Sequence, residues 1–194
     1  RPVMHRDEIR RPIWDRIVAA ADRYNDPGKF TAFIGYEYTS APNRNNLHRV
    51  VMFRDGGDKA GKVLPLSAVE SSDPEQLWAY LENYEKTTGG RALAIPHNGN
   101  LSNGRMFDDV TFTGAPLSAD YARRRQRWEP LYEVTQIKGD GETHPLLSTR
   151  DEFADYYRWD RGNFGTELKT PAMLPREYAR QALLRGLAYE AKLG

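Results

Sequence analysis

Two apolar runs in this chain each end in a side chain that can bind a metal ion. The run from Phe33 to Tyr38 contains Glu37, and the apolar stretch 92–96 is followed by His97. Both runs have the length and composition of buried strands. In an α/β sheet, the loops at the carboxyl ends of the strands converge on ligands. We therefore expect Glu37 and His97 to meet at one edge of a sheet.

A third potential ligand, His48, opens the next apolar run, over residues 48–54. It can point back into the mouth that Glu37 and His97 define. One carboxylate and two imidazoles are a suitable ligand set for a divalent metal such as zinc, manganese or iron. The sequence thus predicts a metal site formed by Glu37, His48 and His97.

Two of these ligands have an ordinary structural alternative. Glu37 can be a strand-end carboxylate paired with Arg44 or Arg49, and His48 can be a strand-edge histidine bonded to backbone. His97 is harder to explain in this way, because a proline fixes the backbone before it and an Asn-Gly-Asn turn follows it. Such a turn is typical of a loop that faces a ligand.

Five further residues are candidates for contacting a substrate near this site. Arg49 and Lys138 can offset negative charge on a substrate, and Asn98 belongs to the turn after the second run. Glu142 and His144 follow another strand end and can reach the same mouth, with a structural loop as the alternative. The fourth histidine, His5, is expected at the surface.

The alternation of strand-like and helix-like segments predicts an α/β fold. Strands are expected near residues 31–37, 48–54, 91–95 and 131–137, and helices over 12–25, 73–88, 118–128 and 175–193. A strand, a helix and a strand in that order predict a βαβ unit with a right-handed crossover. We therefore expect one largely parallel sheet.

Composition narrows the classes of function. The 194 residues fit a single domain, and a net charge of +1 argues against a nucleic-acid partner. No apolar stretch approaches the ~18 residues of a membrane span, so no membrane association is expected. The absence of cysteine excludes thiolate ligands and disulfides. A mean hydropathy of -0.75 is polar for a complete α/β domain, so we expect part of the surface to be covered by other chain. If flanking strands are absent, the open edges of the sheet predict self-association.

Five segments of the chain resemble a known family, namely residues 30–40, 46–51, 95–100, 133–140 and 184–187. They resemble the domain-of-unknown-function family DUF3604, which is similar to the polymerase-and-histidinol-phosphatase (PHP) superfamily of metal-dependent phosphoesterases. The likeness covers essentially the whole chain.

The resemblance implies a distorted β/α barrel with metals at the carboxyl ends of its strands. By position, Glu37 would bridge metals, while His48 and His97 would each bind one. Members also have an H-x-H pair and an Asp-His motif upstream and an Asp-x-His motif downstream, none of which occurs here. The chain therefore resembles the central part of a larger PHP-like hydrolase domain, with a partial β/α barrel, part of the metal shell and no activity expected alone.

Two functions follow from these observations. The first is a part of a metal-dependent hydrolase that uses metal-activated water on a small-molecule substrate, with a phosphate ester as the expected class. The alternative is a non-catalytic α/β module that binds a ligand or partner through the same mouth and has a degenerate metal site. Metal analysis of the full-length protein distinguishes them.

Overall fold

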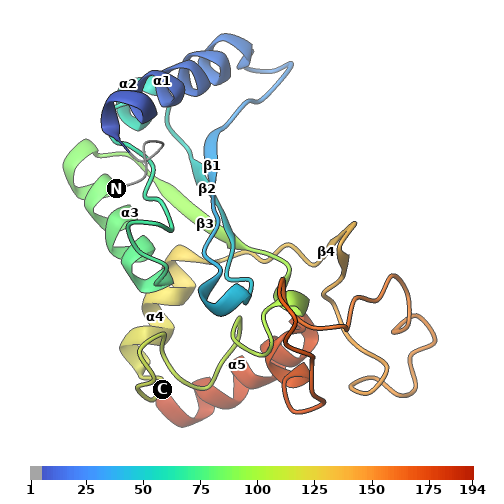
Figure 1. Ribbon diagram of the computed structural model, residues 1–194. Coiled ribbons are helices and arrows are strands. Elements are labelled where there is room, and N and C mark those ends of the chain that lie inside the picture. Colours follow the sequence, from blue (N-terminus) through green and yellow to red (C-terminus); the bar gives the residue numbers. More distant parts are fainter. Residues whose placement is uncertain (1–5) are drawn as a thin grey trace.

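The structure, a computed structural model, describes residues 6–194 (Figure 1). A central sheet is flanked by helices, and a long irregular region precedes the last helix. The helices are α1 (Asp7–Tyr24), α2 (Gly57–Ala60), α3 (Pro74–Thr88), α4 (Ala119–Trp128) and α5 (Ala179–Leu193). The strands are β1 (Ile34–Tyr38), β2 (Arg49–Phe53), β3 (Ala92–Pro96), β4 (Thr135–Gln136) and β5 (Gly139–Asp140). The short 3-10 turns are η2 (Pro42–Arg44), η3 (Gly99–Leu101) and η4 (Leu174–Arg176).

The main sheet has three strands in the order β1-β2-β3, and both pairings are antiparallel. Tyr38 lies opposite Arg49, and Arg49 lies opposite Pro96. Three of the four predicted strands therefore share one sheet. The prediction of a largely parallel sheet, and with it the distorted β/α barrel, is wrong.

The path between β2 and β3 explains the antiparallel arrangement. After β2, residues 54–73 run back along the sheet before any long helix begins. Near the end of this segment, the carbonyl oxygens of Ser71 and Ser72 accept hydrogen bonds from the hydroxyls of Tyr38 and Ser40, beside the end of β1. α3 then runs away from that edge and β3 returns to it, antiparallel to β2. The order strand, helix, strand gives two parallel strands only when the helix itself brings the chain back to the edge where the first strand began.

The prediction that residues 131–137 form a fourth strand of the main sheet is also wrong. Only β4 is extended, and it pairs with β5 in a separate two-stranded antiparallel hairpin. Residues 131–134 touch the main sheet through a single parallel bridge between Glu133 and His97. Gly139, with φ of 109°, allows the chain to turn back at this point.

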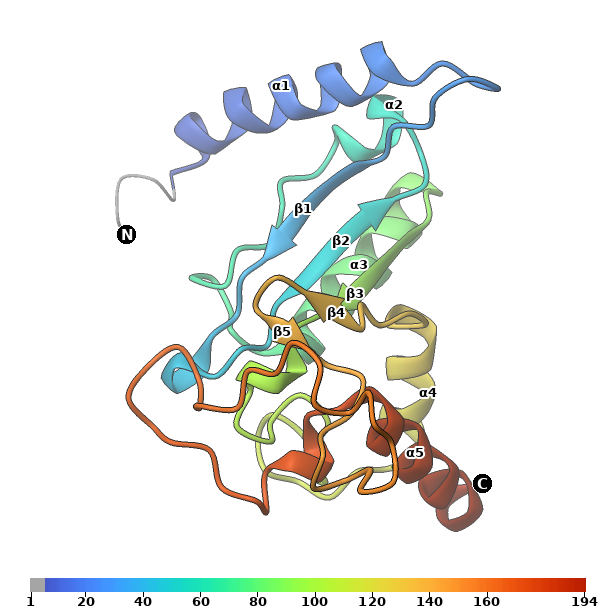
Figure 2. The same ribbon diagram turned by 90° about the vertical axis from the view of Figure 1, so that its right-hand side faces the viewer.

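The core lies between α3 and one face of the sheet, which Figure 2 shows in front of that helix. Strand side chains alternate between the two faces, so every second residue packs against the helix. The opposite face is more open, and it carries Glu37. The helix contributes Leu77, Trp78, Leu81 and Tyr84, and the sheet Ile34, Tyr38, Val51, Phe53 and Ala94.

Helix boundaries follow local signals in some places and not in others. Asp73 caps α3 by accepting a hydrogen bond from the Glu75 N–H at 2.8 Å, and Gly89 ends this helix in the left-handed region. Pro12, a residue type that favours the first turn of a helix, lies inside α1. Among the described residues, no helix is both long and apolar enough to cross a membrane.

Candidate metal centre

Strand direction and side-chain alternation bring the three predicted ligands together. β1 and β3 end at the edge where β2 begins, so the residues at those ends are neighbours. The ladder continues one step further, because the His97 N–H donates to the His48 carbonyl oxygen at 3.4 Å. Glu37 precedes Tyr38, which faces α3, so the Glu37 side chain faces the open side. His48 and His97 have the same parity and lie on this open face.

The ligand atoms of this cluster converge closely. Glu37 Oε1 lies 2.8 Å from His48 Nδ1 and 3.3 Å from His97 Nε2. One ligand atom from each of the three residues lies within 4.8 Å of the others. Donors bound to a tetrahedral zinc ion at ~2.0–2.2 Å stand about 3.4 Å apart. Small side-chain movements therefore suffice to place all three around one ion.

The orientation of His97 leaves Nε2 directed at Glu37. On the other side of the ring, Nδ1 lies 3.4 Å from the Ile95 carbonyl oxygen and 4.0 Å from Glu133 Oε2. Gln136 Nε2 donates to the same Glu133 oxygen at 2.7 Å. A histidine that binds metal usually directs its second nitrogen to a carbonyl or carboxylate oxygen in this manner.

The cluster favours an ionised carboxylate and neutral imidazole. Partial burial raises the pKa of Glu37, but the charges and hydrogen bonds of His48 and His97 outweigh it, so the pKa is lowered overall. Burial lowers the pKa of His48, and the neighbouring Glu37 reverses this only in part. Ionised carboxylate and neutral imidazole are the forms that bind metals.

Two asparagines hold the loops that carry the histidines. Asn46 Oδ1 accepts a hydrogen bond from the His48 N–H at 2.9 Å. Asn98 adopts φ of 52°, a left-handed conformation that asparagine tolerates better than most residues. At Gly99, a Cβ atom would overlap the Glu177 carbonyl oxygen and the Tyr132 hydroxyl, so this loop needs glycine for close approach. Asn46 Nδ2 and Asn98 Oδ1 are buried without a hydrogen-bond partner among the described residues.

Arg49, a predicted substrate contact, lies on the wrong face. It follows His48 directly, so its side chain points toward α3 rather than into the mouth. Its guanidinium pairs with buried Glu129 at 2.9 Å. This contact also removes the alternative in which Arg49 is the partner of Glu37.

The other predicted substrate contacts divide into two groups. Asn98 adjoins the cluster, and Lys138 is near enough for its charge to lower the pKa of His48. Glu142 instead pairs with Arg180 at the surface. His144 is buried and lies 3.5 Å from Asp160, with Nδ1 accepting the Leu146 N–H. His5 lies outside the described residues.

The sequence reasoning overlooked two residues beside the cluster. Glu133 was predicted only as part of the strand 131–137. Its place in the next strand-like segment after His97 was a signal that it could lie near the cluster. Phe164, whose ring lies 5.5 Å from that of His48, comes from the irregular region that precedes α5. No sequence signal placed it there.

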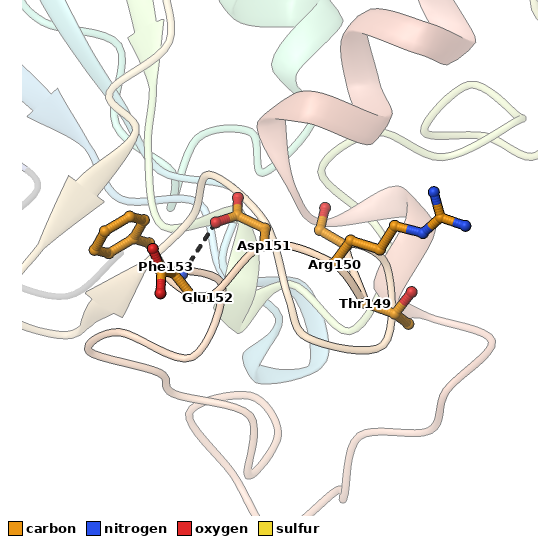
Figure 3. A pocket seen from close by; sticks show the side chains of 6 residues that line it. Thr149, Arg150, Asp151, Glu152 and Phe153 are labelled. Atoms are coloured by element: carbon orange, nitrogen blue, oxygen red, sulfur yellow. Dashed lines mark hydrogen bonds between the residues drawn. The ribbon is translucent and has the colours of Figure 1, made fainter.

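A larger hollow exists elsewhere, inside the loop of residues 148–153 (Figure 3). One continuous segment lines it, and Asp151 there accepts hydrogen bonds from the Phe153 N–H and from Arg180. None of its lining residues belongs to the cluster. This hollow and the metal-binding side chains therefore lie in different places, and the ligand set identifies the candidate site.

Comparisons with known proteins agree with the resemblance at the family level. A family model described as protein of unknown function (DUF3604) matches residues 2–194. No curated protein and no solved structure matches the chain.

Proposed function

The chain belongs to the DUF3604 family, and on that premise we propose that it holds a divalent metal with Glu37, His48 and His97 as part of a metal-dependent hydrolase. The proposed substrate class is a phosphate ester, in keeping with a relationship to the PHP superfamily. The observation that carries the proposal is the convergence of one carboxylate oxygen and two imidazole nitrogens within 4.8 Å. The proposed domain is the central part of a larger hydrolase domain.

The donor set fits zinc, manganese or iron. Oxygen and imidazole nitrogen are ligands for all three metals. His97 is oriented by groups on the side of its ring away from Glu37, because its Nδ1 faces the Ile95 carbonyl oxygen and Glu133. A metal bound here would polarise a phosphoryl oxygen and lower the pKa of water, which is the chemistry of hydrolytic metal centres.

The residues of the chain have distinct roles in this proposal. The Glu37 carboxylate lies between the two imidazoles and remains 46% exposed, so it is accessible from the mouth. Lys138 contributes positive charge near His48, which favours an anionic substrate. Arg49 has no role in substrate binding in this proposal, because its guanidinium pairs with Glu129.

Metal-dependent hydrolysis by the full-length gene product tests this proposal. The protein is stripped with a chelator and reloaded with zinc, manganese or iron(II), and phosphate release from a panel of phosphate esters is measured. We expect activity only after reloading, and its loss in His97→Ala but not in the control His144→Gln. If the reloaded protein binds metal and a ligand but hydrolyses no ester, the result contradicts the proposed hydrolase activity. It then supports the alternative, a non-catalytic binding module.

A further inference from the structure

The segment 158–169, named here the strap, contacts the loop between β1 and β2 and the loop after β3. Its first anchor is Asn163, whose Nδ2 donates to Asn45 Oδ1 at 2.7 Å and to the Asn43 carbonyl oxygen at 3.2 Å. The Phe164 N–H donates to the Arg44 carbonyl oxygen at 3.0 Å. In Figure 2 the orange strap lies beside the cyan turn η2, in agreement with these bonds.

The strap is anchored a second time on the loop after β3. Lys169 Nζ donates to the Asn100 carbonyl oxygen at 2.8 Å and pairs with buried Glu177 at 2.6 Å. The two anchors thus hold the loop after Glu37 and the loop after His97. The strap therefore spans the two loops that frame the cluster.

The turn that receives the strap has an unfavourable backbone. Asn43 and Arg44 adopt φ of 52° and 66°, in the left-handed region. Such conformations persist in residues other than glycine only where surrounding contacts enforce them, and they concentrate at functional sites. Here they aim two successive carbonyl oxygens at Asn163 and Phe164.

The result of this anchoring is an aromatic ring placed against a proposed ligand. The rings of Phe164 and His48 are 5.5 Å apart and inclined by 35°. Phe164 remains 41% exposed, so part of the ring is free. Asn163, by contrast, is buried and holds the backbone beside it. Phe164 therefore forms an apolar wall next to a polar, anion-attracting centre.

We propose that Phe164 is a specificity-determining residue that binds a flat apolar group next to the phosphoryl group of the substrate. This inference rests on the proposed function and names its substrate class, a phosphate ester of an aromatic or similarly planar group. Aromatic rings in offset or edge-to-face contact gain stability beyond simple burial. A phosphate ester with a small alkyl group gains nothing from this wall.

Binding of two non-hydrolysable phosphonates tests the inference on the zinc-loaded full-length gene product. Phenylphosphonate and methylphosphonate share the anionic head and differ in the ring. Isothermal titration calorimetry should show phenylphosphonate binding about three- to tenfold more tightly, the range given by aromatic contacts. Phe164→Ala should abolish this preference, leaving the affinities for methylphosphonate and zinc within about twofold of the wild-type values.

Matched variants separate a specificity role from support of the fold. Phe164→Tyr should keep the preference, Phe164→Leu should reduce it, and Phe153→Ala, an exposed aromatic of the same irregular region, should leave it unchanged. Equal binding of the two phosphonates by the wild type overturns the inference, as does a preference that survives Phe164→Ala. A parallel loss of zinc affinity in Phe164→Ala also overturns it. Zinc binding without an aryl preference defeats this inference alone, whereas failure of the wild type to bind zinc defeats the proposed function.

Discussion

At the residue scale, the position of each side chain along its strand decides which groups meet. His48 and Arg49 are adjacent, yet one faces the open side of the sheet and the other the core. The sequence predicted the convergence of Glu37, His48 and His97 because these side chains can bind a metal and lie at the ends of predicted strands. The prediction of Arg49 as a substrate contact overlooked this alternation, which places Arg49 on the face opposite His48. The position of Glu133 beside the cluster depends on backbone pairing, because Glu133 forms a bridge with His97.

Glu133 provides the first prediction. Its carboxylate lies 4.0 Å from His97 Nδ1, on the side of the ring opposite Glu37. Replacing Glu133 by alanine should weaken zinc affinity by about 10- to 100-fold, the usual effect of removing a group that orients a ligand. Competition with a chromophoric chelator measures the affinity. Glu82→Ala, at an exposed position of α3, is the control, and equal affinities in the two variants would refute this role for Glu133.

At the element scale, α3 is the helix that most directly organises the sheet. Its start was predictable because an aspartate cap, a proline and a glutamate occur in sequence, and its end because Gly89 favours the left-handed region. Its buried Leu77, Leu81 and Tyr84 were predictable from helical spacing. What helical spacing does not reveal is that the preceding segment already returns to the starting edge of the sheet.

The cap of α3 gives a second prediction. Asp73 Oδ1 accepts the Glu75 N–H at 2.8 Å, and alanine cannot replace this bond. Asp73→Ala should lower the free energy of unfolding by about 1 kcal/mol. Chemical denaturation followed by circular dichroism measures this change. Glu82→Ala should remain within about 0.5 kcal/mol of the wild type, and an equal loss in both variants would exclude a specific cap.

A buried ion network joins α3, α4 and β2 through Glu129. The Glu129 carboxylate accepts hydrogen bonds from Arg49 at 2.9 Å and from Trp78 Nε1 at 2.8 Å, and it pairs with Arg125 at 3.3 Å. Burial raises the pKa of Glu129, but the two arginines outweigh this and lower it below its usual value of 4.5. The ionised form therefore stabilises the fold.

The third prediction concerns the pH dependence of this network. Because the folded-state pKa of Glu129 is lowered, its contribution is complete above the unfolded-state pKa and is lost as pH falls through the folded-state value. Glu129→Gln should lower the free energy of unfolding at pH 7 by about 3–5 kcal/mol, since it leaves buried positive charge without its partner. It should also flatten the dependence of stability on pH below 4.5. Denaturation curves at several pH values test this, and an unchanged slope would contradict it.

At the scale of the whole molecule, the sequence predicted the presence of strands and helices better than their arrangement. A run such as Ala92–Pro96 looks the same in a parallel or an antiparallel sheet, because burial on both faces is compatible with each. Helix α5 shows a similar limit. Its Leu183 and Leu187 have helical spacing, but they are exposed rather than packed.

These exposed side chains support the fourth prediction, that the chain associates with itself. Leu183 and Leu187 are 72% and 63% exposed, and Phe33 is 51% exposed beside the edge strand β1. Apolar surface and unpaired strand edges of this kind are normally covered. Multi-angle light scattering should therefore show a dimer or larger species, and the double variant Leu183→Glu, Leu187→Glu should weaken it. A monomer that is stable across dilution would contradict self-association.

Zinc binding by the wild type and by single-ligand variants tests whether Glu37, His48 and His97 form a metal centre. The purified full-length gene product, freed of metal, is titrated with zinc in calorimetric experiments alongside Glu37→Gln, His48→Ala and His97→Ala. The control is His144→Gln, which changes a buried histidine bonded to Asp160 rather than to the cluster. We expect saturable zinc binding that each ligand variant weakens by at least about tenfold and the control leaves unchanged. Zinc affinity that is equal in all five proteins, or that falls only in His144→Gln, would contradict a metal centre at Glu37, His48 and His97.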